Sequence, residues 1–395
     1  MGLPELQTFP VIAFTVVSKT LERRLISSGG IGMVVVSADK LETLIKTMFV
    51  QAGSGDEEAG AVSFNLVEAN LKGHDSHGVG LVPRYIQNCQ NKVLMPNAHM
   101  SVEEDKGVVL QMTGNMGYGQ VVGKEATEFA ISRTQEYGVC VAGLRNSHHL
   151  GRIGAWGEMC AEAGLVSIHY VNVIGHQPLV APYGGAEGRY ATNPYCTAIP
   201  APPDGEPIIL DMATSKVAMG KVRVAYNKGE DMPDDCLINP NGAKTNDPGV
   251  MFREQIGALL PVGDHKGSGL ALIAEILAGA LVNGGTCVPD NQKTGTIHNN
   301  MLSIVMDPAA LGNVDYFRSE LSGITEYVKS ARPAQGVEKV LVPGDPERQS
   351  MVKRRAKGIP IDEQTWQEII TSAGSVGILE PVALELAGQA RQVAS

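Results

Sequence analysis

The residues best suited to chemistry stand together near the middle of the chain. His148 and His149 are adjacent, follow Asn-Ser, and precede Arg152 by a few residues. The apolar run 138–144 before them predicts a buried strand, and the segment 156–164 after them predicts a helix. Histidine exchanges a proton near neutral pH, and arginine binds a carboxylate through two parallel hydrogen bonds. This turn suits chemistry on a small acid, although each histidine alone could simply satisfy backbone groups in a polar loop.

A second candidate segment contains two histidines separated by three positions. On a helix, His74 and His77 would share a face and could ligate a metal ion. Gly73 and Gly78 flank the segment and favour a loop instead. We therefore expect a turn that binds a ligand through Ser76 and His77.

Two more segments carry groups that could bind a cofactor. His265 and Lys266 open an apolar segment, 266–281, that predicts a long helix. Backbone N–H groups at a helix start, with a lysine beside them, can bind a phosphate. Asp211 lies at the end of a predicted strand, followed by Thr214, where it could bind a ribose hydroxyl or act as an ordinary helix cap. The GxGxxG fingerprint of a Rossmann domain is absent.

Composition limits the class of protein. The chain has 395 residues and a net charge of -10, which argues against a nucleic-acid-binding surface. No uninterrupted apolar run reaches the about 20 residues that a membrane-spanning helix needs. The six cysteines form no CxxC pair, so we expect reduced thiols in a cytoplasmic enzyme.

Helical periodicity is concentrated at both ends of the chain, with strand patterns between them. This order predicts a mixed α/β fold in which both ends form a helical domain beside a central sheet domain. Lys339-Val340-Leu341-Val342 is expected to be a further strand. The expected units are an upstream extension with little structure over 1–32, with Met33 as the natural start, a first helical part over 33–105, a sheet domain that binds cofactor and substrate over 106–325, and a second helical part over 326–395.

Taken together, five segments resemble the malate/L-lactate dehydrogenase family of the non-Rossmann type. They are Gly73–Gly78, Asn146–Gly151, Thr192–Pro194, Leu210–Ser215 and His265–Gly267. The resemblance runs from about Met33 to the C-terminus. It implies an oxidoreductase that uses NAD or NADP to interconvert 2-oxo and 2-hydroxy acids. It also implies a largely antiparallel cofactor-binding sheet and a homodimer with the active site near the interface.

The resemblance also suggests roles for individual residues. It makes His149 the proton donor, with His148 beside the substrate and with Ser76 and His77 near the substrate and the nicotinamide. The positions that match cofactor-contacting stretches are His77, Gly151, Arg152, Ile153, Ile209, Leu210, Asp211, Met212, Ala213, His265, Lys266, Gly344, Asp345, Pro346 and Glu347.

One position departs from the family pattern. Many members carry an arginine five residues after the motif serine, where it holds the substrate carboxylate, but this chain has Leu81 there. Another cation must then bind the carboxylate, because burying an anion without a partner is costly. We expect Arg152 to do so, with Arg84 as the alternative. The apolar Leu81 would suit a larger, aromatic 2-oxo acid such as hydroxyphenylpyruvate.

Two other classes of protein fit parts of this pattern. A metal-dependent hydrolase could use His74, His77, His148 and His149 as ligands, whereas the dehydrogenase hypothesis needs no metal ion. A ligand-binding protein without catalytic activity is the second alternative. Metal analysis and assays with 2-oxo acids would distinguish the three.

Overall fold

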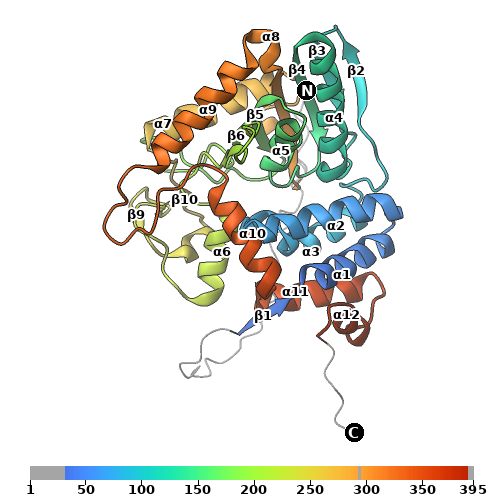
Figure 1. Cartoon of the computed structure of the whole chain (residues 1–395). Helices are drawn as coiled ribbons and strands as arrows, with labels where there is room; N and C mark the ends of the chain where they lie inside the picture. Colours follow the sequence, from blue (N-terminus) through green and yellow to red (C-terminus); the bar gives the residue numbers. More distant parts are fainter. Residues whose placement is uncertain (1–31, 292–294, 390–395) are drawn as a thin grey trace, which may run out of the picture.

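The computed structural model describes residues 32–291 and 295–389. All but one residue of the predicted upstream extension therefore lie outside the described residues. Within them the chain forms a mixed α/β fold, as predicted, with a sheet and its covering helices on one side and a layer of helices on the other (Figure 1).

A sheet of seven strands forms the central part of the molecule. The strand order is β2-β3-β4-β11-β5-β6-β7, and only β3 and β4 run parallel. The prediction of a largely antiparallel sheet is confirmed. The strands are β2 (Ser101–Asp105), β3 (Val109–Thr113), β4 (Val139–Ser147), β5 (Val166–Ile174), β6 (Tyr195–Ile199), β7 (Ile208–Met212) and β11 (His298–Met306).

The two faces of this sheet are covered by different helices. Side chains on a strand alternate between faces, and Met301 of β11 joins the core beneath α4 (Gly119–Tyr137) and α5 (Gly154–Glu162). The neighbouring Asn300 points the other way. There it meets the segment that follows α7 (His265–Ala274) and the π-helix η4 (Glu275–Ala280).

The helical domain is formed from both chain ends. Near the N-terminus lie α1 (Ala38–Gln51), α2 (Asp56–Leu71), η1 (Asp75–His77), η2 (Val79–Leu81) and α3 (Val82–Gln90), and near the C-terminus lie α11 (Glu363–Ser375) and α12 (Glu380–Leu386). Buried residues of both ends, including Phe49, Leu66 and Ile369, form one core. Strands β1 (Met33–Val36) and β12 (Ile359–Asp362) pair antiparallel and join the two ends.

Among the described residues no single helix is long and apolar enough to cross a membrane; only α11 and α12 together meet the criteria of length and composition, and a bend of 119° separates them.

A small third unit, which the sequence pattern did not predict, lies beside the end of β7. It contains α6 (Met219–Lys228), η3 (Pro248–Met251) and a sheet of β8 (Leu237–Ile238), β9 (Lys244–Thr245) and β10 (Ala258–Leu259). Val222, Leu237 and Leu259 share its core. Because α6 packs against η1, this unit connects the sheet domain to the helical domain.

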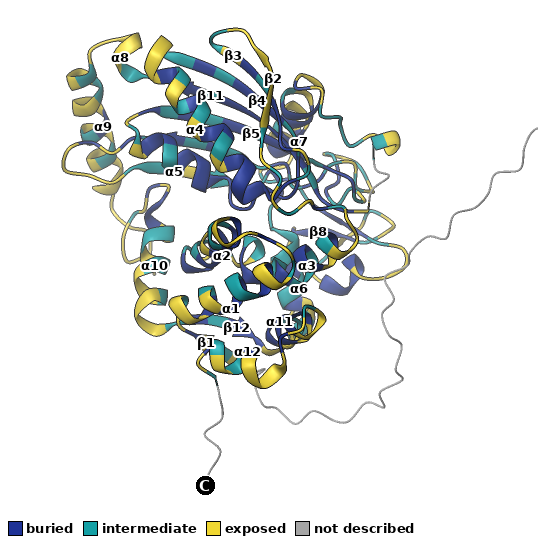
Figure 2. Ribbon diagram, turned by 90° about the vertical axis from the view of Figure 1, so that its right-hand side faces the viewer, coloured by how far each residue is buried: buried dark blue, intermediate teal, exposed yellow. Residues whose placement is uncertain are grey.

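One prediction about a single element is wrong, and another holds with a change of helix type. The run 339–342 forms no strand, and the carbonyl of the next residue, Pro343, accepts one hydrogen bond from Ile209 N–H. The long helix expected over 266–281 continues as a π-helix after residue 274. The sequence pattern also missed α9 (Val314–Lys329) and α10 (Asp345–Lys357); α9 is exposed along most of its length (Figure 2). The remaining short helices are α8 (Pro308–Leu311) and η5 (Pro289–Asn291).

Candidate active site

The predicted site residues lie on several elements. Ser76 and His77 lie in η1, Arg84 in α3, His148 to Ile153 between β4 and α5, Ile209 to Ala213 on β7 and just after it, His265 and Lys266 at the start of α7, and Gly344 to Glu347 at the start of α10.

We call residues 146–151 the histidine turn. It includes the last two residues of β4 and begins at a bulge in that strand, where Leu144 and Ser147 pair with Met301 and Asn299 of β11. Asn146 has the left-handed φ of 53°, and Gly151 at the other end has φ 72°. Bulges redirect side chains at the ends of strands. The chain thereby leaves the sheet and carries His148 and His149 toward the helical domain.

His149 is held through one ring nitrogen by a buried tyrosine. Its Nδ1 lies 2.6 Å from the hydroxyl of Tyr85, and Gln120 Nε2 donates to that same hydroxyl at 2.9 Å. Burial raises the pKa of Tyr85, so the hydroxyl keeps its proton. With the hydroxyl oxygen accepting from Gln120, its O–H donates to Nδ1, and this network assigns the ring proton of neutral His149 to Nε2.

The other ring nitrogen of His149 faces His77. Its Nε2 lies 3.3 Å from His77 Nδ1, and the two rings stack with an interplanar angle of 4°. Burial, with the neighbouring His74 and Arg152, lowers the pKa of His77 to about 4. Burial, together with His77, His148 and Arg84, lowers the pKa of His149 well below its usual value. Both imidazoles are therefore neutral near pH 7 in the free protein.

His148 makes a different set of contacts. It is fully buried, lies edge-on to Tyr85, and accepts a hydrogen bond on Nε2 from Asn88 Nδ2 at 2.8 Å. Its Nδ1 then carries the proton and has no hydrogen-bond partner in the described structure. Burial, with Arg84 and His298 nearby, lowers the pKa of His148 to about 3.

Arg84 supplies a cation next to these histidines. Its charge lowers the pKa of His148, His149 and His176, in each case alongside the larger effect of burial. The side chain is half-buried, and no described carboxylate forms an ion pair with it. Burial also lowers the pKa of Arg84 itself. Its guanidinium is available to an anion. Leu81, at the family's arginine position, packs against the core of the helical domain.

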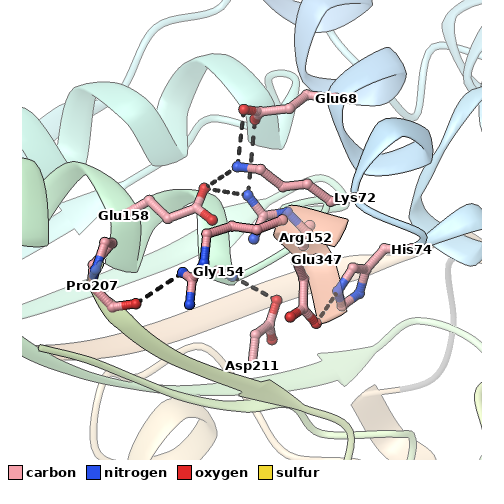
Figure 3. Close-up of polar contacts among 10 residues, drawn as sticks. Glu68, Lys72, His74, Arg152, Gly154, Glu158, Pro207, Asp211 and Glu347 are labelled. Carbon is pink, nitrogen blue, oxygen red and sulfur yellow. Dashed lines mark hydrogen bonds and ion pairs between the residues drawn. The ribbon is translucent and has the colours of Figure 1, made fainter. Parts of the chain in front are cut away.

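Arg152, in contrast, has its charge compensated within the fold. It is 2% exposed and pairs closely with Glu158, with Glu68 at 3.8 Å (Figure 3). Lys72 Nζ contacts the same two carboxylates, Glu158 at 2.6 Å and Glu68 at 3.0 Å. Burial opposes both charges of the Arg152–Glu158 pair, but the contact raises the pKa of Arg152 and lowers that of Glu158.

Next to this network, polar groups from three elements converge (Figure 3). Asp211 of β7 accepts a hydrogen bond from Gly154 N–H, at the start of α5, at 2.7 Å. Burial raises the pKa of Asp211 despite the nearby His74 and Arg152. Glu347 of α10 lies 3.2 Å from His74 Nε2.

The other acidic residue at the start of α10 is satisfied internally. Asp345 accepts hydrogen bonds from Arg348, from the Val342 N–H and from Lys329. Although burial opposes it, these contacts hold the pKa of Asp345 at about 2. Its carboxylate therefore fixes the start of the helix, whereas Glu347 contacts His74.

Comparison with known proteins agrees with this arrangement. The family model of malate/L-lactate dehydrogenase matches residues 36–370. The chain belongs to this family. It is 40% identical over 345 residues to hydroxycarboxylate dehydrogenase B of Escherichia coli K12, covering 87% of this chain and 94% of that protein. It is 38% identical to L-lactate dehydrogenase of Cupriavidus necator, covering 82% and 92%. Malate dehydrogenase from Pyrococcus horikoshii has a similar structure, with a TM-score of 0.78, 30% identity and coverage of 89% and 98%. As a member of a dehydrogenase family, the protein is an oxidoreductase that acts on CH–OH groups.

The described residues fit the nicotinamide cofactor that dehydrogenases of this family use. Asn65 Oδ1 and Gln120 Oε1 are buried acceptors without a partner, and both side chains lie against Gly151, where a Cβ would come within 2.9 Å of Asn65 Oδ1. A carboxamide N–H₂ is a donor that two such acceptors could bind. The Asp211 carboxylate could bind a ribose hydroxyl. His265 and Lys266 are exposed at the start of α7, beside Thr214, where a phosphate could bind.

The geometry gives no support to the metal-dependent hydrolase. His74 contacts Glu347, His77 contacts His149, and His148 contacts Asn88. Across the described ranges, no group of three or more His, Cys, Asp or Glu side chains could hold a metal ion.

Several residues of this dehydrogenase site escaped the sequence analysis. The most important is Tyr85, which with Val82 and Ile86 forms the buried face of α3 and therefore matches an ordinary core pattern. A buried tyrosine needs a partner for its hydroxyl, which was the one available signal. Gln120 and Asn65 carried no such signal, because Tyr85 and Gly151, which they meet, are distant in sequence. Glu158 and Lys72 carried none because the contact between them joins residues 86 positions apart.

Proposed function

We propose that this chain catalyses the reversible reduction of 2-oxo acids to 2-hydroxy acids with NAD or NADP as the cofactor. The contact that carries the proposal is His149, fixed by Tyr85 and facing His77, beside the unpaired cation Arg84. When bound, the reduced nicotinamide supplies the hydride that adds to C2 of the oxo acid. Asn65, Gln120 and Asp211 would hold the cofactor on the side of the site bounded by Gly151.

His149 is the proton donor in this proposal. Negative charge develops on the substrate carbonyl oxygen during reduction, and a proton from His149 Nε2 neutralises it. The anionic substrate offsets the positive charge of Arg84, which otherwise lowers the pKa of His149. The imidazolium form that this favours donates its Nε2 proton and becomes the neutral tautomer with a proton on Nδ1, which is bonded to the Tyr85 oxygen. In the oxidative direction this tautomer accepts the hydroxyl proton on Nε2. Ser76 and His77 lie beside the reacting groups and orient them.

Arg84 is the group that we now favour for binding the substrate carboxylate. The sequence pattern favoured Arg152, whose charge is already compensated by Glu158 and Glu68. We assign Arg152 to the cofactor side, next to Asp211. With Leu81 in place of a cation, the site suits a larger, aromatic 2-oxo acid such as hydroxyphenylpyruvate, with His148 lining the substrate side.

A screen of 2-oxo acids with NADH and with NADPH tests the function. Consumption of the reduced cofactor with pyruvate, oxaloacetate or hydroxyphenylpyruvate is expected, and its loss in His149→Ala confirms that the reaction belongs to this site. Binding of the acids without turnover would instead support the ligand-binding alternative. Comparing the rates of consumption of NADH and NADPH in parallel assays gives the preference between NAD and NADP.

We also propose a cytoplasmic homodimer with the active site near the interface. All six cysteines are free thiols, which suits a reducing compartment. A row of exposed apolar side chains on α7 and η4, including Leu272, Ile273 and Ile276, offers a surface for a second copy. Sedimentation should show a dimer, and Ile276→Glu should shift it to a monomer. A wild-type monomer at micromolar concentration would contradict the assembly without bearing on the reaction.

A further inference from the structure

Two neighbouring asparagines of β11 hold the two ends of the histidine turn. Asn300 Oδ1 accepts a hydrogen bond from Asn146 N–H at 3.0 Å. Asn299 Oδ1 accepts one from Leu150 N–H at 2.9 Å. The backbone segment between these two bonds carries His149, so both ends of this segment are tied to one strand.

The asparagine pair is anchored by further buried amides. Asn300 Nδ2 donates to Asn172 Oδ1 on β5 at 2.9 Å, and Asn299 Nδ2 donates to the Asn172 backbone carbonyl at 3.1 Å. Asn172 Nδ2 in turn donates to Glu275 Oε2, at the start of the π-helix η4, at 3.2 Å. The other carboxylate oxygen of Glu275 accepts from Asn193 Nδ2 at 2.8 Å. We call these five residues the amide ladder.

The fold makes room for this ladder at its centre. All five side chains are at most 3% exposed. A Cβ on Gly284, in the turn after η4, would lie 2.2 Å from Asn300 Cγ, so only glycine fits there. The bulge in β4 lies opposite Asn300, between the pairs that Asn299 and Met301 form with that strand, at the start of the histidine turn. Buried polar networks whose members are bonded to one another favour a single local arrangement.

The ladder compensates for a weakness of the histidine turn. The turn starts from a left-handed residue, Asn146, near the end of β4, and its residues 148–151 lie beyond that strand. The side-chain contacts of His149 come from other elements, Tyr85 on α3 and His77 in η1. Without support for the backbone, the imidazole could follow movements of the turn.

We propose that Asn299 and Asn300 are positioning residues for His149. They fix the backbone on both sides of His149. This holds its Nε2 within hydrogen-bond distance of the position that the carbonyl oxygen of the substrate must occupy. Asn172 and Glu275 keep the two amides oriented so that their oxygens face the turn. Neither asparagine touches the reacting atoms. The inference rests on the proposed function, in which His149 is the proton donor.

Alanine variants of the two asparagines test the inference, with Ser303→Ala as the matched control. Ser303 lies on the same strand, is 5% exposed and bonds to His169, which plays no part in the reaction. We expect Asn300→Ala and Asn299→Ala to lower kcat by roughly 10- to 100-fold, because small misplacements of a catalytic group have effects of this size. The substrate KM and the cofactor Kd should stay within about two-fold of wild type. The primary isotope effect on kcat with deuterated NADH should rise as the chemical step becomes limiting.

The control separates positioning from general destabilisation. If kcat in the asparagine variants falls no further than in Ser303→Ala at a similar Tm, the inference is wrong. It is also wrong if the loss appears in KM or in the cofactor Kd while kcat is unchanged. Should Asn300→Ala fail to fold, Asn299→Ala, which leaves the link from Asn172 to Glu275 intact, carries the same test. Full activity in His149→Ala would instead overturn the proposed function, and thus identifies which of the two has failed.

Discussion

His149 is bonded to a tyrosine hydroxyl through one nitrogen and faces His77 with the other, whereas His148 is fully buried against Asn88. This difference leads to the first prediction. His149→Ala should lower kcat by roughly 10²-fold or more, the usual effect of losing a general acid, while the cofactor Kd changes little. His148→Ala should mainly lower the Tm, because it leaves Asn88 with one buried partner fewer. Steady-state kinetics on both variants checks this, and an active His149→Ala beside an inactive His148→Ala would reverse the assignment.

The two arginines of the site give the second prediction. Arg84→Gln should reduce kcat/KM for the 2-oxo acid by roughly 2–4 kcal/mol of transition-state binding, the range for a buried charged hydrogen bond. Its cofactor Kd should be unchanged. Arg152→Gln should show the opposite pattern, with weaker cofactor binding. Titration of cofactor fluorescence together with kinetics distinguishes them. If Arg152→Gln loses kcat/KM alone, Arg152 rather than Arg84 binds the carboxylate.

For single residues, the sequence shows which side chains could take part in the chemistry, but not which residues they contact in the fold. His77, His149 and Asp211 stood out because their chemistry is visible in the sequence. Glu158 lies only six residues after Arg152, but the contacts that Glu68 and Lys72 make with this pair depend on how α2 meets α5, and no local pattern contains this information.

Among the elements, α2 and α5 are joined across the domain boundary by alternating charges. Glu158 of α5 contacts both Arg152 and Lys72, and Glu68 of α2 completes the set. Glu158→Gln should lower the free energy of unfolding by about 3–5 kcal/mol, because it leaves buried cations with too little compensating charge. Urea denaturation measures this effect. Glu162→Gln, an exposed carboxylate on the same helix, is the control and should change stability little. If the two variants changed the free energy of unfolding equally, the charge network would make no net contribution to stability.

Helices and strands whose apolar residues recur at regular spacing could be predicted from the sequence. Elements that depend on contacts with distant parts of the chain could not. The pattern of α1 and α2 is amphipathic enough to locate both helices. Helix α10 is highly charged and has almost no buried face, so its pattern resembled a loop. The apolar run 339–342 has the composition of a strand but lacks a partner strand along its length. The intrinsic preference of a segment for strand or helix determines its structure only where tertiary contacts do not override it.

For the whole molecule, the buried histidines predict a dependence of stability on pH. His77 and His169 have pKa values lowered to about 4, chiefly by burial, and His148 to about 3. Below about pH 6.5 the unfolded chain binds protons that the folded chain does not, so stability falls as the pH falls. Each such histidine contributes up to about 1.4 kcal/mol per pH unit.

Urea denaturation between about pH 7 and about pH 5 should reveal this slope. His169→Gln should make it shallower. His99, which is exposed and has its pKa raised by Glu125, acts with the opposite sign: it stabilises the folded state at low pH and loses this effect as the pH rises. His99→Gln should therefore leave the loss at low pH in place. A midpoint that does not change with pH would contradict the prediction.

The division into a helical and a sheet part followed from the order of patterns along the chain, because helices at both ends must bury their apolar faces somewhere. The small unit around α6 was not foreseen, since its strands span only two residues each. Strands this short leave no periodicity to detect.

The pairing of β1 with β12 has a consequence for how the chain folds during synthesis. Helices α1 to α3 leave the ribosome before the large sheet, but part of their core is supplied by residues 359–387, which emerge after it. All seven strands of the large sheet lie between residues 101 and 306, so that sheet can assemble earlier. The usual order, in which N-terminal domains fold first, is thus reversed. The first helices therefore expose apolar side chains to chaperones and proteases until residues 359–387 have emerged.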